Sequence, residues 1–117
     1  MMSPDRSYYA YMMASPSRVL YIGVSGDLER RVWQHKNAVS GGFVRRYGCT
    51  KLVWFDETSD VHEAIREEKR LKQWRRKWKV DLIEQDNPHW RDLAQEWGLA
   101  DPESSSGWAY MPKMADW

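Results

Sequence analysis

Three short runs of β-branched and aromatic residues predict three strands in the first half of the chain. The runs cover residues 8–13, 19–23 and 50–55, and such side chains favour strands because they pack well on a pleated surface. Ser, Pro and Ser at 15–17 separate the first two runs with residues typical of a tight turn. We therefore expect the first two strands to form an antiparallel hairpin.

Helical spacing follows the second and the third run. Asp27 can cap a helix in which Leu28, Val32 and His35 recur on one face, with Arg31 on the same side. A second helix is predicted over 61–74, with a cap within residues 58–60. We expect a short helical turn at 43–47 closed by Gly48, a short helix near 77–84, and another that begins at 87–88 and ends near Gly98.

Length and periodicity predict a single folded unit with two loose ends. The chain of 117 residues is long enough for one core and too short for two. Residues 1–6 read as a flexible terminus, 7–98 as the domain, and 99–117 as an acidic tail with serines and tryptophans but no periodicity. The two tail tryptophans, Trp108 and Trp117, could pack on a neighbour, although the sequence leaves the oligomeric state open.

Composition and charge narrow the class of protein. Residues 1–79 carry 16 Lys and Arg against 9 Asp and Glu, whereas residues 80–117 carry 2 against 8. A basic body points to a polyanionic partner. No apolar run reaches the ~18 residues that span a bilayer, and no secretory signal is visible. The single cysteine, Cys49, has no metal-binding partner at suitable spacing and is expected in the core, so we expect a cytoplasmic protein without membrane association.

An acidic residue interrupts the apolar face of the helix predicted over 61–74. The stripe Val61, Ala64, Ile65 and Leu71 predicts another apolar residue at position 68, and the chain has Glu68. A carboxylate is costly to bury unless it is paired or bound to a metal. The sequence leaves two interpretations: a salt bridge to a nearby arginine, or a ligand for Mg²⁺, which needs only one or two carboxylates beside phosphate oxygens and water.

Two polar residues on the first predicted helix offer phosphate chemistry. Arg31 and His35 are four residues apart and share a helix face. A guanidinium can bind a phosphate in a bidentate way, but an ordinary solvated face would look the same. Tyr21 precedes them at a strand end, and Tyr11 lies in the paired strand. Either phenol could instead be a buried tyrosine with a satisfied hydroxyl.

The order and spacing of these residues resemble the GIY-YIG nuclease superfamily, specifically its small single-domain members with no assigned cellular role. The resemblance covers roughly residues 7–93. YIG at 21–23 is the second signature triplet intact, and YAY at 9–11 stands where the family has Gly-Ile-Tyr, with Tyr9 in place of the glycine. Arg31 falls on the catalytic arginine, His35 on the following His or Tyr, Glu68 on the metal-binding glutamate, and Asn87 on the late asparagine.

The resemblance implies an α+β fold, a three-stranded antiparallel sheet flanked by helices, and an endonuclease that hydrolyses phosphodiester bonds in DNA. Glu68 would hold Mg²⁺ or Mn²⁺, and Arg31 would neutralise charge on the phosphate. A phenol, from either Tyr11 or Tyr21, would help remove a proton from water, with His35 as a helper. Asn87 would support the site. The enzyme would respond to DNA structure or damage, as in DNA repair, more than to sequence.

Basic residues on the second half of the domain predict a nucleic-acid surface. Cations and two tryptophans, Trp74 and Trp78, alternate between residues 66 and 79. Such a ridge can contact phosphates, and the indoles can stack on bases or instead face the core. The residues predicted to bind nucleic acid are Arg45, Arg46, Lys69, Lys72, Arg75 and Arg76.

A binding module of the same fold is the alternative function. Such a protein would bind nucleic acid or another protein with weak catalysis or none. Large family members carry separate DNA-binding domains, and 117 residues leave no room for one. A protein partner could then supply substrate specificity. The acidic segment after residue 80 could also cover the basic face as an internal competitor.

Overall fold

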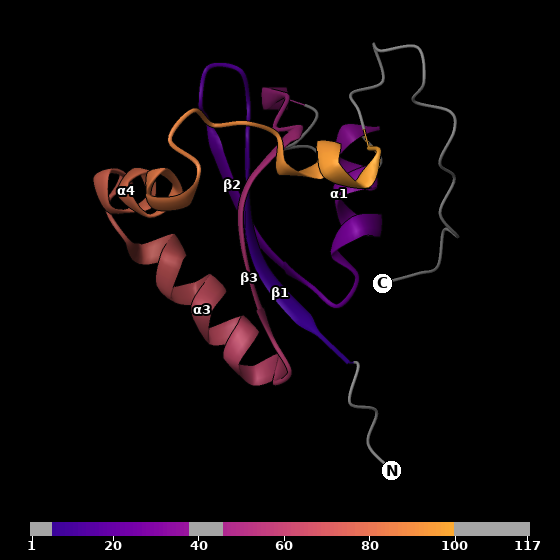
Figure 1. The fold of residues 1–117 in the computed structure, drawn as a ribbon. Helices are drawn as coiled ribbons and strands as arrows, with labels where there is room; N and C mark the ends of the chain where they lie inside the picture. The colour runs from indigo at the N-terminus through magenta and orange to yellow at the C-terminus, as the bar shows by residue number, and fades with distance from the viewer. Residues whose placement is uncertain (1–5, 38–45, 100–117) are drawn as a thin grey trace.

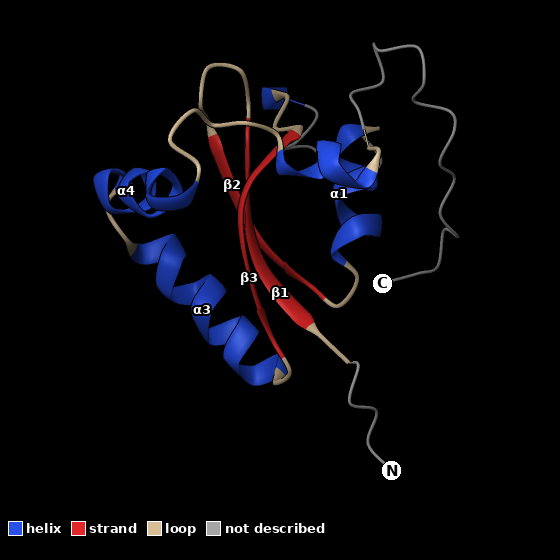
Figure 2. Cartoon of the chain, in the orientation of Figure 1, coloured by secondary structure: helices blue, strands red, loops and turns tan. Residues whose placement is uncertain are grey.

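The computed structural model describes residues 6–37 and 46–99. Within these segments three strands and three α-helices are followed by a short 3-10 helix (Figures 1 and 2). The elements are β1 (Tyr8–Ala14), β2 (Leu20–Ser25), α1 (Leu28–Lys36), β3 (Lys51–Thr58), α3 (Val61–Gln73), α4 (Arg76–Asp86) and η1 (Leu93–Trp97).

The three strands form one antiparallel sheet with β1 in the centre, in the order β2-β1-β3. Tyr11 of β1 lies opposite Gly23 of β2 and opposite Phe55 of β3. The pairing with β3 shifts between Met12 and Met13, which leaves Val53 as an extra residue on β3. The shift is a β-bulge, which bends a strand and increases its twist. The α+β class and the antiparallel sheet are therefore as predicted.

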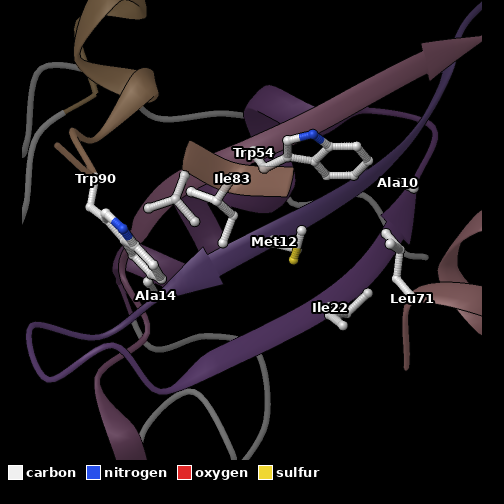
Figure 3. Packing of buried hydrophobic residues seen from close by; sticks show 9 residues of the cluster. Ala10, Met12, Ala14, Ile22, Trp54, Leu71, Ile83 and Trp90 are labelled. Carbon is white, nitrogen blue, oxygen red and sulfur yellow. The ribbon is translucent and has the colours of Figure 1, made fainter. Parts of the chain in front are cut away.

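Helices cover both faces of the sheet, so two apolar clusters form. Figure 1 shows α3 and α4 on one side and α1 with η1 on the other. Side chains of a strand alternate between faces, so β1 supplies Met12 to the cluster beneath α3 and α4, and Met13 to the cluster beneath α1. Figure 3 shows the first cluster, in which Leu71 and Ile83 of the two helices pack against the sheet.

Local sequence explains where the two site helices begin. The Asp27 side chain accepts a hydrogen bond from the Arg30 amide and caps α1. The Asp60 side chain accepts from the His62 amide and caps α3. Each cap satisfies an amide that has no partner inside the helix. Both helices therefore start where the sequence predicts.

The prediction of a helix that begins at residues 87–88 is wrong. Asn87 ends α4 as its C-cap, a turn follows, and only the 3-10 helix Leu93–Trp97 forms before Gly98. The Asn87 side chain donates to the carbonyl of Arg91 and accepts from its amide. These local bonds compete with helix formation. Of the helical turn predicted at 43–47, Arg46 and Tyr47 are helical and the rest lies outside the described residues.

A buried ion pair joins the end of α1 to the start of η1. The Nζ of Lys36 pairs with the Asp92 carboxylate, and both side chains are almost wholly buried. Lys36 also donates to the Thr50 carbonyl, while Asp92 accepts from the amides of Leu52 and Ala94. A buried ion pair is tolerated only where further hydrogen bonds satisfy its atoms. The pair thus fixes α1 against β3 and η1.

Burial bears on two sequence predictions, the core position of Cys49 and the boundary of the tail. Cys49 is fully buried in the cluster beneath α1, as predicted for a core residue. Leu99 is buried in the same cluster, so the packed region reaches one residue into the segment assigned to the tail. The remainder of that tail lies outside the described residues. No helix of the described part is long and apolar enough to cross a membrane.

Candidate active site

The centre of the site is the close approach of Tyr11 to the backbone at Gly23. The two residues face each other across β1 and β2. A Cβ at position 23 would lie 2.6 Å from the Tyr11 Oη and 2.7 Å from its Cζ. Real side chains do not tolerate such a contact, so only glycine leaves room for the phenol. The glycine of the YIG triplet is therefore required by the Tyr11 ring.

His35 of α1 completes a group of three rings. Its Nε2 lies 2.9 Å from the Tyr11 Oη, within hydrogen-bond distance. Its ring centroid is 4.9 Å from that of Tyr21 and 5.6 Å from that of Tyr11, both edge to face. The two tyrosine centroids are 6.3 Å apart. Helix α1 thus places His35 beside both phenols.

Burial keeps His35 neutral. The side chain is 1% exposed, and burial, with the nearby Arg31 charge, lowers the pKa of the imidazole to about 3. Both causes disfavour the imidazolium form. The Nδ1 atom is buried and has no hydrogen-bond partner among the described residues. At neutral pH His35 can donate or accept one hydrogen bond at Nε2, but it carries no charge.

The pKa of the Tyr11 phenol is raised well above its usual range. Burial is the largest cause, and the nearby Tyr21 adds to it. The positive charge of Arg31 acts in the opposite direction, and the negative charge of Glu68 raises the pKa further.

The Tyr11 hydroxyl interacts with two side chains. The His35 Nε2 lies within hydrogen-bond distance of its oxygen, and the tautomer of the imidazole decides which of the two atoms donates. An interaction with the Tyr21 side chain also raises the Tyr11 pKa. Because its pKa is raised, Tyr11 is a protonated phenol at neutral pH.

Glu68 approaches this group from α3. The inward stripe is confirmed, since Ala64 and Leu71 are buried and the Glu68 side chain is only 13% exposed. Its Oε2 lies 2.5 Å from the Nζ of Lys72, one turn further along the same helix. The described partner of Glu68 is thus a lysine. Tyr11, Tyr21 and His35 thus contact one another, and Glu68 lies on the inward side of α3, which packs against β1 and β2.

Asn87 is separate from this group in its contacts. It is buried, and its Nδ2 donates to the carbonyls of Val53 and Arg91, while its Oδ1 accepts from the Arg91 amide. All of these described bonds go to backbone atoms. Since Val53 is the bulge residue of β3, Asn87 holds the bulge and the segment that leads to η1. Its contacts suit a supporting role.

The residues predicted to bind nucleic acid lie mainly on the outer faces of α3 and α4. Lys69, Lys72, Arg75 and Arg76 are exposed. Arg46 is also exposed, with its guanidinium 5.6 Å from the centroid of the Tyr47 ring. Arg45 lies outside the described residues.

The two tryptophans of this surface differ in burial. Trp74 is partly buried against the core, whereas Trp78 is 51% exposed, so the core placement is wrong for Trp78. Their rings meet edge to face at 5.9 Å. Trp78 of α4 is therefore the indole that a ligand can reach.

The donor set around Glu68 is sparse. No group of three or more His, Cys, Asp or Glu side chains gathers within the described segments in a way that could hold a metal ion. Mg²⁺ is usually held by one or two carboxylates together with waters and substrate phosphates, not by an all-protein cage. A single, largely buried carboxylate such as Glu68 fits that kind of site.

Comparisons with known proteins point to one family. The family described as the GIY-YIG catalytic domain matches residues 7–81, a segment that includes both tyrosines, Arg31, His35 and Glu68 and ends before Asn87. A UPF0213 protein of Aeromonas hydrophila is 32% identical over 94 residues, which are 80% of this chain and 68% of the relative.

Two further similarities have the same family label. The UPF0213 protein OB0043 of Oceanobacillus iheyensis is 30% identical over 80 residues, 68% of this chain and 93% of that protein. The solution NMR structure of the UPF0213 protein BH0048 from Bacillus halodurans is 22% identical, with a TM-score of 0.49 over 76% of this chain and 95% of that one. From the family match and the relatives above 30% identity, the chain belongs to the GIY-YIG nuclease superfamily, as a small member of the UPF0213 type.

Proposed function

We propose that this protein is a metal-dependent endonuclease that hydrolyses phosphodiester bonds in DNA. The observation that carries the proposal is that two separated halves of the sequence meet. The tyrosines, Arg31 and His35 come from the first third of the chain, and α3, which carries Glu68 on its inward side, packs against the two strands that carry the tyrosines. A guanidinium, a carboxylate and phenols in one place are the groups that phosphodiester hydrolysis needs.

Arg31 would stabilise the phosphate. A guanidinium offers donors in a fixed fork that matches two phosphate oxygens, and it would neutralise charge that develops there during reaction. Arg31 lies on α1 one turn before His35, so the same helix that orients the imidazole orients the guanidinium.

Tyr21 is the better candidate to accept a proton from the attacking water. Tyr11 is 1% exposed, its pKa is raised by burial, and its hydroxyl is engaged by His35 and Tyr21. Tyr21 is only partly buried and its ring lies beside the neutral His35. Tyr11 and His35 would therefore position the Tyr21 phenol and remain protonated and neutral during the reaction.

Glu68 would hold the metal, Mg²⁺ or Mn²⁺. When bound, such an ion supplies Lewis-acid stabilisation to the phosphate and to the leaving oxygen. Lys72 lies on the Glu68 carboxylate, so a metal ion held by this carboxylate would have to displace its ammonium. Asn87 would support the site at a distance through the β3 bulge.

A plasmid nicking assay with matched variants tests this function. Glu68→Gln removes the proposed metal ligand, and its control is Glu67→Gln, a neighbour on α3 that pairs with Arg70. Arg31→Gln removes the proposed phosphate ligand, and its control is Arg30→Gln, which pairs with Asp27 near the N-terminus of the same helix. Activity of wild type should require added Mg²⁺ or Mn²⁺ and disappear with a chelator.

The two site variants should lose about 10²-fold or more in nicking rate, as expected for groups that act only in the transition state, while both controls stay within about threefold. Equal residual cleavage by wild type and Glu68→Gln would identify a contaminating nuclease and disprove the proposal. Nicked, branched and base-damaged duplexes compared with intact DNA would give the substrate preference.

One observation favours a second function, nucleic-acid binding without significant turnover. The Glu68 carboxylate is already satisfied by Lys72, and an exposed indole at Trp78 lies among basic side chains. A protein of this kind would bind DNA with the same affinity in chelator and in Mg²⁺, and Lys72→Ala would not change its nicking rate. An enzyme that must displace Lys72 should bind metal more tightly after that substitution.

A further inference from the structure

A basic hollow lies on the sheet face opposite the tyrosines. Its volume is about 520 Å³, and it lies between the β1–β2 turn and the first turns of α4. The residues that line it are Ser17, Arg18, Val19, Leu20, Arg76 and Lys79. Every charged residue of this lining is a cation. Like charges so placed repel one another, and an anion between them would relieve the repulsion.

Arg18 is held in the hollow by an unusual backbone and by stacking. It has a φ of 70°, in the left-handed region that few residues other than glycine adopt. Its guanidinium carbon lies 4.5 Å from the centroid of the Trp90 ring, a distance at which a cation is attracted to an indole face. Trp90 is buried, has a φ of 57°, and donates from Nε1 to Glu84.

This stacking orders the guanidinium without neutralising it. The indole carries no charge, and the planar guanidinium keeps its N–H donors free of the ring at its edge. Arg18 is exposed and makes no described salt bridge. The arginine is thus prepared to receive a ligand, because part of the entropy cost of ordering its long side chain is already met.

The other two cations come from the start of α4. Arg76 and Lys79 are three residues apart, so they share a helix face. Neither has a carboxylate partner in the described segments, in contrast to Lys77, which pairs with Asp81. The first turn of α4 contains no acidic residue, and its N-cap residue Arg75 makes no side-chain cap. The positive end of the helix adds to the charge of the three side chains.

We propose that the hollow formed by Arg18, Arg76 and Lys79 binds a phosphate of the nucleic-acid strand, away from the bond that is cleaved. The proposal rests on the proposed function. Leu20 lines the hollow, and the next residue, Tyr21, faces the candidate active site. Adjacent strand residues point to opposite faces, and β2 is an edge of the sheet. A strand that crosses this edge reaches both places.

Binding of fluorescent DNA, measured by anisotropy in chelator so that no cleavage occurs, tests the hollow. Arg18→Gln and Lys79→Gln are the test variants. Arg6→Gln and Arg91→Gln are their controls, because both residues are exposed cations that neither line the hollow nor belong to the basic ridge between residues 66 and 79. Each test variant should weaken binding about 3- to 10-fold and lower the slope of log K against log salt by roughly 0.7–0.9, as one lost phosphate contact does.

Both controls should stay within about twofold of wild type. Arg18→Lys keeps the charge and should restore most of the salt slope, which separates lost charge from a disturbed turn. Unfolding curves of every variant check that the fold is intact. If wild type binds DNA and the two test variants match their controls, the hollow is not a phosphate site although the nuclease proposal is unaffected.

Two further results separate the hollow from the nuclease proposal. Wild type that binds DNA through the hollow but never nicks plasmid would retain the hollow and disprove the nuclease. If wild type binds no DNA, titration with inorganic phosphate decides whether the hollow binds any anion. Backbone NMR shifts at Arg18 and Lys79 would then identify a free-phosphate site and overturn the assignment to nucleic acid, and the absence of shifts would disprove any anion site.

Discussion

The Tyr11 phenol occupies the space above Gly23 that any other residue would fill with its own Cβ. The distance from that Cβ position to the Tyr11 Oη would be 2.6 Å. Tyr11 and Gly23 are direct partners in the register of β1 and β2, so neither strand can shift to relieve the contact without moving every other pair. The tyrosine of one signature triplet thus requires the glycine of the other, because no larger residue fits beside its ring.

Gly23→Ala should destabilise the protein by about 1–3 kcal/mol, because the added methyl group overpacks a rigid ring. Gly26→Ala is the matched control, since its Cβ would meet Tyr8 at an ordinary 3.6 Å and the smaller entropy of the unfolded chain favours alanine by up to ~1 kcal/mol. Urea unfolding should therefore move the two midpoints in opposite directions. A stabilised Gly23→Ala would contradict the steric argument.

His35 predicts a loss of stability in acid. Its pKa is about 3 in the folded protein against about 6.5 in an unfolded chain. Between these values the unfolded state binds one more proton, so the free energy of unfolding falls by up to about 1.4 kcal/mol per unit as the pH decreases. The contribution is fully present above pH 6.5 and is lost as the pH falls toward 3.

The measurement is the free energy of unfolding at several pH values for three proteins. His35→Gln should lack this part of the acid dependence, whereas His62→Gln, at an exposed position on α3, should retain the slope of wild type. Parallel curves for wild type and His35→Gln would show that His35 does not titrate below its normal range.

The two tyrosines should differ in what they contribute to nicking. Tyr21→Phe should reduce the nicking rate by about 10²-fold or more with little change in DNA affinity, as for loss of a proton acceptor. Tyr11→Phe removes the hydroxyl bonded to His35 and should cost about 1 kcal/mol of stability with a smaller loss of rate. A larger rate loss in Tyr11→Phe would assign the proton transfer to Tyr11.

Lys36 should be far more important to stability than other paired lysines. Lys36→Met leaves the buried Asp92 charge without its counter-ion, with only backbone amides as partners, and should cost about 3–5 kcal/mol. Lys77→Met breaks an exposed pair with Asp81 at 3.0 Å and should cost less than about 1 kcal/mol. Thermal unfolding of the two variants checks the contrast. Similar melting temperatures would mean that the Lys36–Asp92 pair is replaceable.

The exposed indole at Trp78 should contribute to binding of unpaired DNA. Trp78→Ala should weaken binding of a single strand by about 1–3 kcal/mol, the usual cost of losing one stacked base, and leave affinity for blunt duplex nearly unchanged. Anisotropy with the two DNA forms measures the difference, and quenching of the Trp78 fluorescence by DNA would support it. Equal losses for both forms would indicate a general disturbance of α4.

Local patterns in the sequence predict most of the framework. The three strands, the caps at Asp27 and Asp60, and the inward position of Glu68 follow from periodicity of 2 and 3.6 and from cap chemistry, which depend on neighbours in sequence. The same patterns place His35 on the face of α1 that points to the sheet. The placement of residues carried by such elements can be predicted well.

Contacts between distant segments account for what the sequence does not predict. Asn87 reads as a helix start, but it bonds to Val53 across 34 positions and ends α4 instead. Lys36 finds its counter-charge in Asp92, and Arg18 finds its aromatic partner in Trp90. Nothing in the local pattern around any of these residues indicates the partner, because each pairing is a product of the tertiary fold.

We expect that a fragment of this chain folds completely only if it contains both Lys36 and Asp92. A fragment that stops at residue 81, where the family match ends, would place Lys36 in an apolar interior with no acid to meet it. The carboxylate that completes α1 is 56 residues further along the chain. Packing of α1 against the sheet should therefore wait until Asp92 has been synthesised, with the last described helix acting as the closing element.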